Sequence, residues 1–500
     1  MFGKKFIRLV TALGLGILLL ASIDCKVNQE NIAGRNPVPV LLSISPSAQV
    51  AHMPSFTLTA TGSNFVRDSK IVFNGIERVS EYISPGELTC RIDPDDIPAG
   101  AASQYTGTRD TGSADSTIPV LVCSPSPGGG NSNALEFTIY NNHTFTDPAA
   151  ITPGDAIYAH PALAVDVPGT LFLVYEFYGS NTNIFAIDFT RSTDNGETWE
   201  TPYRLVQSTD SGCYNPCIAL ESRGNINVAY YSGGGIMFIR SQDQGMSWST
   251  PRLLSSFSPG IIEPAMAVNP SDGINIVWPQ QHDNLSSSVY FTRSVDDGAT
   301  WSPQVNVCAG WQNSRWSYNP AIAADDSQGV YVTWTTWPAG GSRYSFVYCN
   351  YSHDNGATWG SRDSYFGVCS SSDIAVDPAG NVDLLLESSY LPFSNQVVFM
   401  QSQDRGVNWN IRIEVTSDRF DSEPGLVIDS AGNINVVYYC YNGFFFNRSV
   451  NSWIDWGAEI SITGSGSGMD MAVDLAGNIY MVYKHGDSQQ LYFLRSHQYL

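Results

Sequence analysis

Two aspartates interrupt a pattern of small residues that recurs along the C-terminal two-thirds of the chain. The pattern lies in a repeated strand, and one position of that strand is occupied by Ala162, Cys217, Ala265, Ala321 and Gly425. Asp373 and Asp470 stand at the same position in two other repeats. Carboxylates that lie close together raise one another's pKa, which suits acid–base work on a glycosidic bond. They could equally hold a hard cation such as calcium, or be solvated without a specific role.

The residue before the repeated strand is polar in five repeats: His160, Asn215, Glu263, Asn319 and Glu423. Because equivalent positions of stacked repeats lie on one ring, we expect these side chains near the mouth of a common channel. The candidate catalytic residues are therefore Asp373, Asp470, Glu263, Glu423 and His160. We expect no cofactor, although these carboxylates could hold calcium.

Aromatic and basic residues gather in loops of the third and fourth repeats. Aromatic rings stack on sugar faces, and arginine binds carboxylates through two parallel hydrogen bonds. Trp278 and Trp334 occupy a position that holds tyrosine in other repeats, so we expect them to cap the hydrophobic core. The residues outside the repeat pattern are the candidate ligand-binding residues: Trp311, Arg315, Trp316, Trp337 and Arg343.

An eight-residue motif shows which elements must position these side chains. It reads Ser, any residue, Asp, any, Gly, any, a small polar residue and Trp, and it begins at Ser192, Ser241, Ser294, Ser352 and Ser402, with a degenerate copy at Ser449. The steps between these serines are 49, 53, 58, 50 and 47 residues, and a period of this size indicates a repeat architecture. Four predicted strands in each of seven repeats predict an all-β domain over residues 141–500, a seven-bladed β-propeller.

This motif resembles the Asp-box (BNR) hairpin of sialidases and other β-propellers. Its Gly supplies the positive φ of a turn, its Asp accepts hydrogen bonds from that turn, and its Trp covers the hairpin. We therefore expect structural roles for Asp194, Asp243, Asp296, Asp354 and Asp404. The boxes should share one face with the Gly-containing turns between first and second strands, which places function among the longer loops of the opposite face.

The last repeat stops at Leu491–Ser496, before a box of its own, and therefore lacks a fourth strand. Residues 145–151 supply a candidate, because Phe145-Thr146-Asp147-Pro148 resembles Trp248-Ser249-Thr250-Pro251, which follows a box. We predict that this N-terminal segment pairs antiparallel with Leu491–Ser496 and closes the ring.

Residues 38–140 are predicted to form a separate β-sandwich of short alternating strands. Ser43-Ile44-Ser45-Pro46, Thr61-Gly62-Ser63-Asn64-Phe65 and Phe73-Asn74-Gly75 resemble the IPT/TIG family of immunoglobulin-like domains. That resemblance implies a spacer or interaction module. Cys90 and Cys123 lie on predicted strands and could bridge the two sheets. Residues 25–37 are then a linker.

The N-terminus and the charge indicate an exported protein. Lys4, Lys5 and Arg8 precede an apolar run, which predicts a signal peptide over residues 1–24. Cys25 follows directly and resembles the acylation site of a bacterial lipoprotein, with ordinary signal cleavage as the alternative. The net charge of −22 argues against nucleic acid and anionic lipid as partners, so only an N-terminal lipid would join the protein to a membrane.

The resemblance to sialidases does not extend to their catalytic residues. Sialidases carry an aromatic-Arg-Ile-Pro motif before the first box, whereas Tyr203-Arg204-Leu205 follows the first box here. Because fold alone does not supply function, the favoured hypothesis is an exported binding or adhesion protein, surface-anchored or secreted, for an extracellular glycan or protein. The alternative is a glycoside hydrolase or lyase of sialidase-like architecture that uses the acidic channel mouth.

Overall fold

The structure is a computed structural model of an all-β protein, and the chain divides into two compact units, Met1–Asn141 and Asn142–Leu500. The described residues are 35–50, 55–93, 96, 116–140, 145–179, 181–210, 212–256, 263–283, 286–308, 315–338, 345–360, 364–391, 394–416, 421–440, 443–449, 456, 459–462, 466–486 and 488–496. The predicted signal peptide and Cys25 lie outside them. No described helix is long and apolar enough to cross a membrane.

The first unit is the predicted sandwich of two sheets. One sheet has the order β1 (Val40–Ser45), β3 (Phe56–Ser63), β7 (Glu87–Ile92) and β6 (Ser80–Ser84). The other has the order β2 (Ala48–Val50), β10 (Leu135–Tyr140), β8 (Ser116–Ser124), β4 (Lys70–Phe73) and β5 (Ile76–Glu77), with β9 (Gly130–Asn131) paired to β8. Side chains alternate between core and solvent along the strands, so Leu58 and Ala60 of β3 are buried together with Val120 and Val122 of β8.

The predicted bridge between Cys90 and Cys123 is wrong, because Cys90 has a free thiol. Cys90 lies on β7 inside the sandwich core, and burial raises its pKa to about 12. A thiol in this setting behaves as a small apolar side chain that packs against the sheet opposite.

The sandwich also begins earlier than residue 38. Asn36, which the sequence analysis assigned to the linker, donates from its backbone N–H to Pro127 O at 2.7 Å. Its side-chain amide donates to Pro125 O at 2.8 Å. These bonds tie Asn36 to the loop that follows β8, so the linker ends before this residue.

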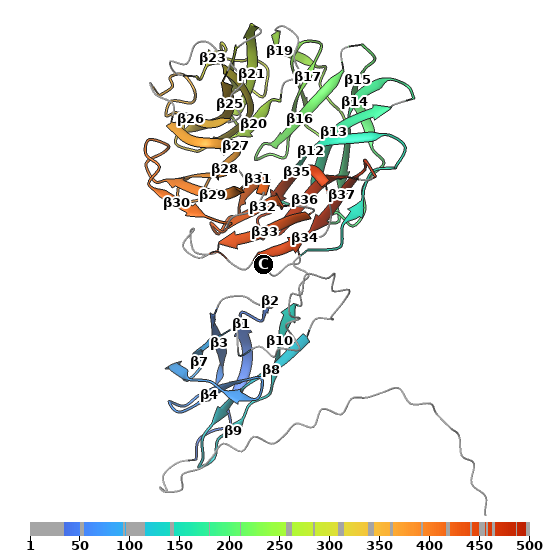
Figure 1. Ribbon diagram of the computed structural model, residues 1–500. Coiled ribbons are helices and arrows are strands. Elements are labelled where there is room, and N and C mark those ends of the chain that lie inside the picture. Colours follow the sequence, from blue (N-terminus) through green and yellow to red (C-terminus); the bar gives the residue numbers. More distant parts are fainter. Residues whose placement is uncertain are drawn as a thin grey trace, which may run out of the picture. The chain divides into compact units, whose positions relative to one another are not determined.

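The second unit is a propeller of antiparallel sheets. Among the described residues, five of its sheets have four strands each. In four of these sheets the strands follow one another along the chain. The first contains β12 (Ile157–Val165), β13 (Leu171–Gly179), β14 (Ile184–Ser192) and β15 (Tyr203–Ser208), and the second contains β16 (Cys213–Leu220), β17 (Ile226–Ser232), β18 (Gly235–Ser241) and β19 (Arg252–Ser256). The third contains β20 (Ala265–Val268), β21 (Ile274–Asp283), β22 (Ser286–Ser294) and β23 (Val305–Asn306), and the fourth contains β31 (Asp421–Ile428), β32 (Ile434–Cys440), β33 (Gly443–Ser449) and β34 (Ile460–Ile462). Figure 1 shows first strands such as β12, β16 and β31 near the centre of the ring and fourth strands such as β15, β19 and β34 at its rim.

One long strand joins two neighbouring blades into a single sheet. That sheet contains β24 (Arg315–Ala324), β25 (Val330–Pro338), β26 (Phe346–Ser352), β27 (Ser364–Val376), β28 (Val382–Leu391), β29 (Ser394–Ser402) and β30 (Ile411–Glu414). The first half of β27 pairs with β26 as a fourth strand, and its second half pairs with β28 as a first strand. Because two predicted blades share this strand, the count of seven blades stays a prediction, whereas the propeller architecture is observed.

The N-terminal segment closes the ring as predicted. The last sheet contains β35 (Gly466–Val473), β36 (Ile479–His485) and β37 (Leu491–Arg495), and β11 (Ala149–Ala150) pairs antiparallel with β37. The N–H of Thr146 donates to Arg495 O at 2.8 Å, and the N–H of Ile151 donates to Leu491 O at 2.9 Å. Phe145 is buried in the same core as residues of β33. The outer edge of the last sheet is therefore paired rather than open.

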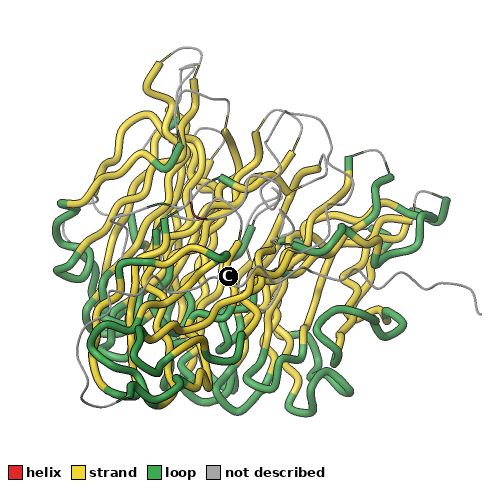
Figure 2. The backbone as a smooth tube through the Cα atoms, turned by 90° about the horizontal axis from the view of Figure 1, so that it is seen from below, coloured by secondary structure: helices red, strands yellow, loops and turns green. Residues whose placement is uncertain are grey.

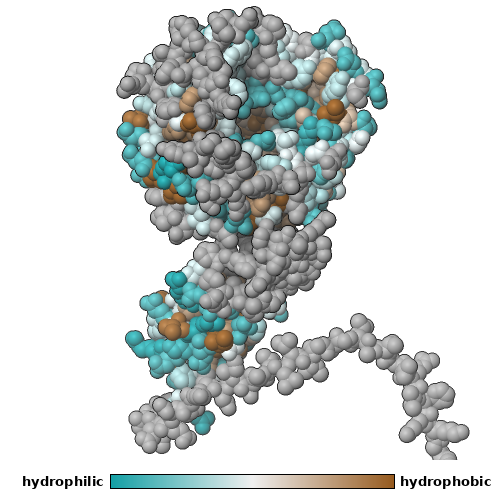
Figure 3. Space-filling view, in the orientation of Figure 1, coloured by the Kyte–Doolittle hydropathy of each residue, from teal (hydrophilic) through white to brown (hydrophobic). Residues whose placement is uncertain are grey.

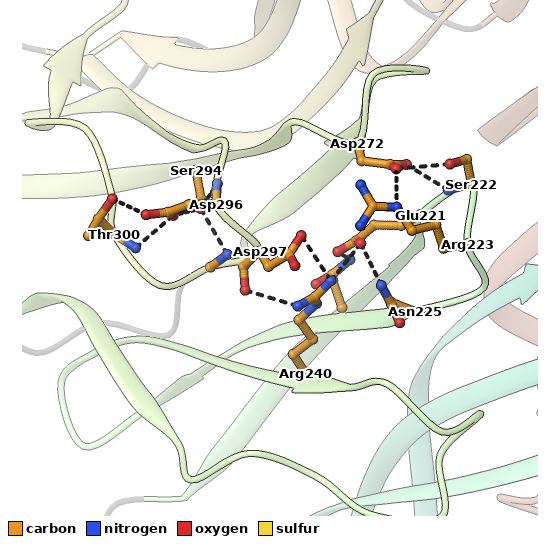
Figure 4. Close-up of polar contacts among 12 residues, drawn as sticks. Glu221, Ser222, Arg223, Asn225, Arg240, Asp272, Ser294, Asp296, Asp297 and Thr300 are labelled. Carbon is orange, nitrogen blue, oxygen red and sulfur yellow. Dashed lines mark hydrogen bonds and ion pairs between the residues drawn. The ribbon is translucent and has the colours of Figure 1, made fainter.

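Each Asp box forms a closed turn. In the box that begins at Ser294, the serine hydroxyl donates to Asp296 Oδ1 at 2.9 Å and accepts from the Gly298 N–H at 2.8 Å. Asp296 also accepts hydrogen bonds from the backbone N–H and the hydroxyl of Thr300 (Figure 4). The equivalent backbone bond recurs at Asp194, Asp243, Asp354 and Asp404. The box aspartates thus hold hairpin turns.

The box tryptophans pack against the neighbouring sheet rather than covering only their own hairpin. Trp301 meets Phe238 of β18 edge-on with ring centroids 5.0 Å apart, and Trp199 meets Phe493 of β37 at 5.2 Å. The box glycine touches the same ring, because a Cβ on Gly298 would lie 2.6 Å from Phe238 and its φ is +76°. The boxes therefore stabilise contacts between sheets, including the contact that closes the ring.

The boxes share one face with the turns between first and second strands, as expected. Figure 2 shows the described turns gathered at one end of the strands. The N–H of Asn355 in a box donates to Gln328 O in the turn after β24 at 2.8 Å. Arg240, which precedes a box, donates to Glu221 at 2.6 Å and to the Asp297 carbonyl at 3.3 Å in the next box (Figure 4). This face is a continuous scaffold of polar turns.

Candidate functional site

A cavity of about 510 Å³ lies among the first strands, toward the ends that are opposite to the boxes. Residues of β12, β24, β27, β31 and β35 line it, together with Glu263 before β20 and Lys484 of β36. All five candidate catalytic residues line this one cavity: Asp373, Asp470, Glu263, Glu423 and His160. The space-filling view shows the propeller surface hollowed near the centre of the ring, with hydrophilic residues beside the hollow (Figure 3).

Three of the polar cavity residues sit in bulges of the first strands. His160 in β12, Asn319 in β24 and Glu423 in β31 have φ values of 43°, 47° and 50°, and the strand register shifts at each of them. Their expected place before the strands is wrong, since β12 already begins at Ile157. A positive φ is unfavourable for histidine and glutamate, so contacts to neighbouring sheets must hold these residues.

Asp373 and Asp470 each join their own first strand to the first strand of the next sheet. Asp373 accepts a hydrogen bond from the N–H of Leu426 in β31 at 2.8 Å and another from Ile374 at 2.8 Å. Asp470 accepts from the N–H of Leu163 in β12 at 2.7 Å and from Met471 at 2.9 Å. Both carboxyls are thereby oriented by backbone donors at the cavity wall. We call the hydrogen bonds from Leu426 to Asp373 and from Leu163 to Asp470 the inter-sheet clasps. The sequence singled out the two aspartates but did not predict these bonds.

Burial raises the pKa of Asp373 to about 6 and that of Asp470 to about 7, while the backbone hydrogen bonds act in the opposite direction. The charge of Asp373 is the smallest of the causes that act on the pKa of Asp470. The charge of Asp373 does raise the pKa of Asp470, as expected, but desolvation is the main cause of the rise at both residues. Both groups can gain or lose a proton near neutral pH.

Glu176 of β13 supports the other side of the cavity, and the sequence analysis missed it. Its Oε1 lies 3.0 Å from His160 Nδ1 and accepts a hydrogen bond from the Asn215 N–H at 2.5 Å. The bond to Glu176 raises the pKa of His160, and burial opposes this effect. The available signal was an acidic residue directly after Tyr175, where two equivalent second strands carry Tyr231 and Tyr439.

Two further charged groups differ in how they are held. Glu423 Oε2 accepts a hydrogen bond from the N–H of Gly468 in the next sheet at 2.9 Å. Glu263 and Lys484 line the cavity without a side-chain hydrogen bond to any described residue. Burial raises the pKa of Glu263, and the charge of His160 opposes that rise. Glu263 and Lys484 are thus the cavity groups most available to a ligand.

The described residues contain no group of three or more His, Cys, Asp or Glu side chains that could hold a metal ion. Calcium also accepts backbone and water oxygens as ligands. The calcium site stays a prediction without a defined ligand set.

The aromatic candidates divide into three groups. Trp316 and Trp337 are exposed, whereas Trp278 and Trp334 are buried and stack on Tyr290 and Tyr348, as their capping role requires. Trp311 and Arg343 lie outside the described residues, and only the backbone of Arg315 is described. Trp316 and Trp337 are therefore the candidate ligand-binding residues whose side chains the structure describes.

Family models match both units. Residues 39–139 match the IPT/TIG domain, and residues 142–328 match the BNR repeat-like domain. The chain combines an IPT/TIG domain with a BNR-repeat propeller. The family resemblances carried by the Ser43–Pro46 segment and by the Asp boxes are thus confirmed. No curated protein matches the sequence significantly.

Several solved structures are similar to this chain at low sequence identity. A protein of unknown function from Dyadobacter fermentans is 15% identical, with a TM-score of 0.46 over 71% of this chain and 100% of that chain. An ulvan lyase is 11% identical, with a TM-score of 0.49 over 70% and 96%. A Hadza microbial sialidase is 14% identical, with a TM-score of 0.41 over 93% and 94%. Likeness of this degree transfers no activity to the BNR-repeat propeller described above.

Proposed function

We propose that this protein binds an extracellular carbohydrate in the central cavity of its propeller. The observation that carries the proposal is the mixture of hydrogen-bond donors and acceptors that several sheets bring to one cavity. Carboxyl groups come from Asp373, Asp470 and Glu263, and basic groups come from His160 and Lys484. Sugar hydroxyls both donate and accept hydrogen bonds, so a wall of this mixed kind suits them.

The electrostatics favour a polyhydroxylated ligand over a bare cation. Burial keeps the pKa values of Asp373 and Asp470 near neutrality, so these carboxyls are partly protonated at neutral pH. Lys484 and His160, whose pKa the bond to Glu176 raises, bring basic groups to the same wall as the glutamates. A cavity with this balance does not concentrate negative charge as a hard-cation site requires.

Hydrogen bonds that fix the polar side chains of the cavity wall favour the binding of one particular ligand. Asp373 and Asp470 are oriented by backbone donors of two sheets each, and Glu423 is held by Gly468. Groups held in this way lose little freedom when a ligand arrives, which favours affinity.

A glycoside hydrolase or lyase is the second candidate function. It is favoured by one observation, namely that carboxyls with pKa values of about 6 and 7 line the cavity. A general acid works best when its pKa lies near the working pH. Binding and turnover therefore have to be separated by experiment.

The test is a glycan-array screen combined with fluorogenic glycosides, using the protein without its predicted signal peptide. The key variant is Glu263→Gln with Lys484→Met, because these side chains line the cavity and hold no other described element. We expect this variant to lose glycan affinity at least about tenfold, the equivalent of about 1.4 kcal/mol. The matched control is Met246→Ala, an exposed apolar side chain in a box turn, which should leave binding unchanged.

Glycan binding that is identical in wild type and the cavity variant would contradict the proposal. Glycoside turnover that disappears in Asp470→Asn while the fold remains intact would favour the enzyme instead.

We further propose that the protein is exported and reaches the cell surface or the medium, with Cys25 as the lipidation site if it stays attached. The charged and apolar N-terminal segment motivates this proposal. Fractionation and fatty-acid labelling of wild type and Cys25→Ser test it. Retention of the wild-type protein in the cytoplasm would contradict it.

A further inference from the structure

Two exposed tryptophans lie on β24 and β25, and β24 also contributes Asn319 to the central cavity. Among the tryptophans whose side chains the structure describes, Trp316 and Trp337 are the exposed ones, at 38% and 49%. They lie directly opposite each other in the antiparallel pair of β24 and β25. Opposite residues of such a pair have side chains on the same face of the sheet, so the two indoles form one aromatic surface.

This surface is held in place by polar contacts. Burial raises the pKa of Tyr318, and the neighbouring side chains of Ser345 and Trp337 oppose that rise as donors to its hydroxyl. On the other face of β24, Ser317 exchanges hydrogen bonds with Ser287 of β22, including one from Ser317 Oγ to Ser287 O at 3.1 Å. The hydrogen bonds to Ser287 hold the strand that carries Trp316 against the preceding sheet, and Trp337 contacts Tyr318 of that same strand.

The strand that carries Trp316 also contributes a residue to the cavity wall. Asn319, which lines the cavity, follows Trp316 by three residues on β24, a distance of about 10 Å along a strand. Thr335, the partner of Tyr318 in the strand register, donates to Ser370 O at 3.3 Å, next to the cavity residue Ser371. The indoles thus stand on the same side of β24 as the wall formed by β27.

We propose that Trp316 and Trp337 form an aromatic subsite that stacks on the sugar units adjoining the unit in the cavity, so that the ligand is a linear glycan chain. This inference rests on the proposed carbohydrate-binding function and specifies its ligand class. A single sugar is too short to reach from the cavity wall to indoles about 10 Å further along the strand. Exposed aromatic faces with a fixed orientation suit the apolar faces of successive sugar rings.

The experiment measures affinity as a function of chain length. Wild type is titrated with arabinan, xylan, polygalacturonate and β-glucan, and with their oligosaccharides from the monosaccharide to the hexasaccharide. The variant Trp316→Ala with Trp337→Ala should lose about tenfold or more in affinity for hexasaccharide and polymer, because it removes both stacking faces. Its affinity for the monosaccharide should stay unchanged. The pair Trp316→Phe with Trp337→Phe should recover most of the loss.

Two controls separate this inference from the function on which it rests. Glu263→Gln with Lys484→Met should weaken binding at every chain length, because it alters the cavity itself. Met246→Ala with Val295→Ala removes two exposed apolar side chains from box turns and should leave the affinity unchanged at every chain length.

Several outcomes overturn the proposal. Equal loss at all chain lengths in the tryptophan variant would indicate a structural role, and no loss at any length would mean that the indoles do not contact the glycan. In both of these cases, if Glu263→Gln with Lys484→Met still loses glycan affinity, the proposed function stands and only the aromatic subsite is contradicted. Absence of binding by wild type to all probes would overturn both.

Discussion

Aspartates accept backbone hydrogen bonds both in the Asp-box turns and at the central cavity, but their pKa values shift in opposite directions. In both regions an aspartate accepts hydrogen bonds from backbone N–H groups, which favours the ionised carboxylate. At the boxes, hydrogen bonds from the turn lower the pKa of Asp194 and Asp243 to about 2. At the cavity, burial raises the pKa of Asp373 to about 6 and of Asp470 to about 7, although each accepts hydrogen bonds from two backbone N–H groups.

The difference teaches that desolvation, not hydrogen bonding, decides the charge state of these aspartates. A box carboxylate keeps water on one side, so every donor stabilises its charge. A cavity carboxylate has exchanged that water for protein atoms, and two amide donors do not replace it. The scaffold face therefore carries permanent charge, and the cavity face carries groups that can change their protonation.

Removing both inter-sheet clasps should have the largest effect on stability. Asp373→Ala with Asp470→Ala leaves the N–H groups of Leu426 and Leu163 without their acceptors, and both leucines are buried. Each unpaired buried donor costs about 1–3 kcal/mol. We expect a fall in Tm at pH 5 of roughly 2–4 °C for each kcal/mol lost, measured by calorimetry. An unchanged Tm would show that the clasps do not join the sheets.

The pH dependence of stability should follow the two kinds of aspartate. The folded-state pKa of Asp373 and Asp470 lies above the ordinary value of 3.8, so the stability linked to their protons is complete below about pH 4 and is lost as the pH rises through 6 and 7. The pKa of the box aspartates lies below 3.8, so their contribution is present above pH 4 and is lost as the pH falls toward 2.

Calorimetry across this range should therefore show a maximum of Tm in mild acid. Asp373→Asn with Asp470→Asn should flatten the decline between pH 4 and 7 without altering the acid limb. A wild-type Tm that rises steadily up to pH 8 would contradict the account.

A third aspartate sharpens the comparison because it is buried away from both faces. Burial raises the pKa of Asp383 in β28 to about 7, and its Oδ2 has no hydrogen-bond partner. Asn275 and Asn435 occupy the same strand position, and each donates to two backbone carbonyls. Asp383→Asn should therefore raise Tm at pH 8 by roughly 2–4 °C, about 1 kcal/mol, with a smaller gain at pH 5. A lower Tm at pH 8 would refute this reading.

The smallest effect is expected at a box. Asp296→Ala removes the acceptor of the Thr300 N–H and hydroxyl in an exposed turn, so water can replace the lost bonds. Tm should fall by less than in the clasp variant, and glycan affinity of the folded protein should stay at the wild-type value. Selective loss of affinity at unchanged Tm would place function on the box face.

The sequence predicted most of the scaffold because each element of it repeats. The Ser-to-Trp spacing of the boxes and the echo of Trp248–Pro251 in Phe145–Pro148 are local signals, and the structure bears out the turn and the ring closure. The partner of each box tryptophan was not predictable in this way, since Phe238 and Phe493 belong to neighbouring sheets.

The sequence pointed to residues that line the central cavity, but it did not predict the contacts that hold them. Asp373 and Asp470 broke a repeat pattern and were found, whereas their acceptor role toward Leu426 and Leu163 depends on contacts between sheets that no single repeat encodes. Glu176 was missed because it lies at an ordinary strand position, and it becomes significant only through the bulge that turns His160 toward it.

Hydrogen–deuterium exchange with and without the glycan that binds best tests the central claim most directly, because it reports where the ligand sits. The account predicts slower exchange at the cavity amides of residues 159–163, 423–427 and 467–471, with no change in the box hairpins of residues 192–199 and 241–248. Protection confined to the box hairpins, with unchanged exchange at the cavity, would contradict it.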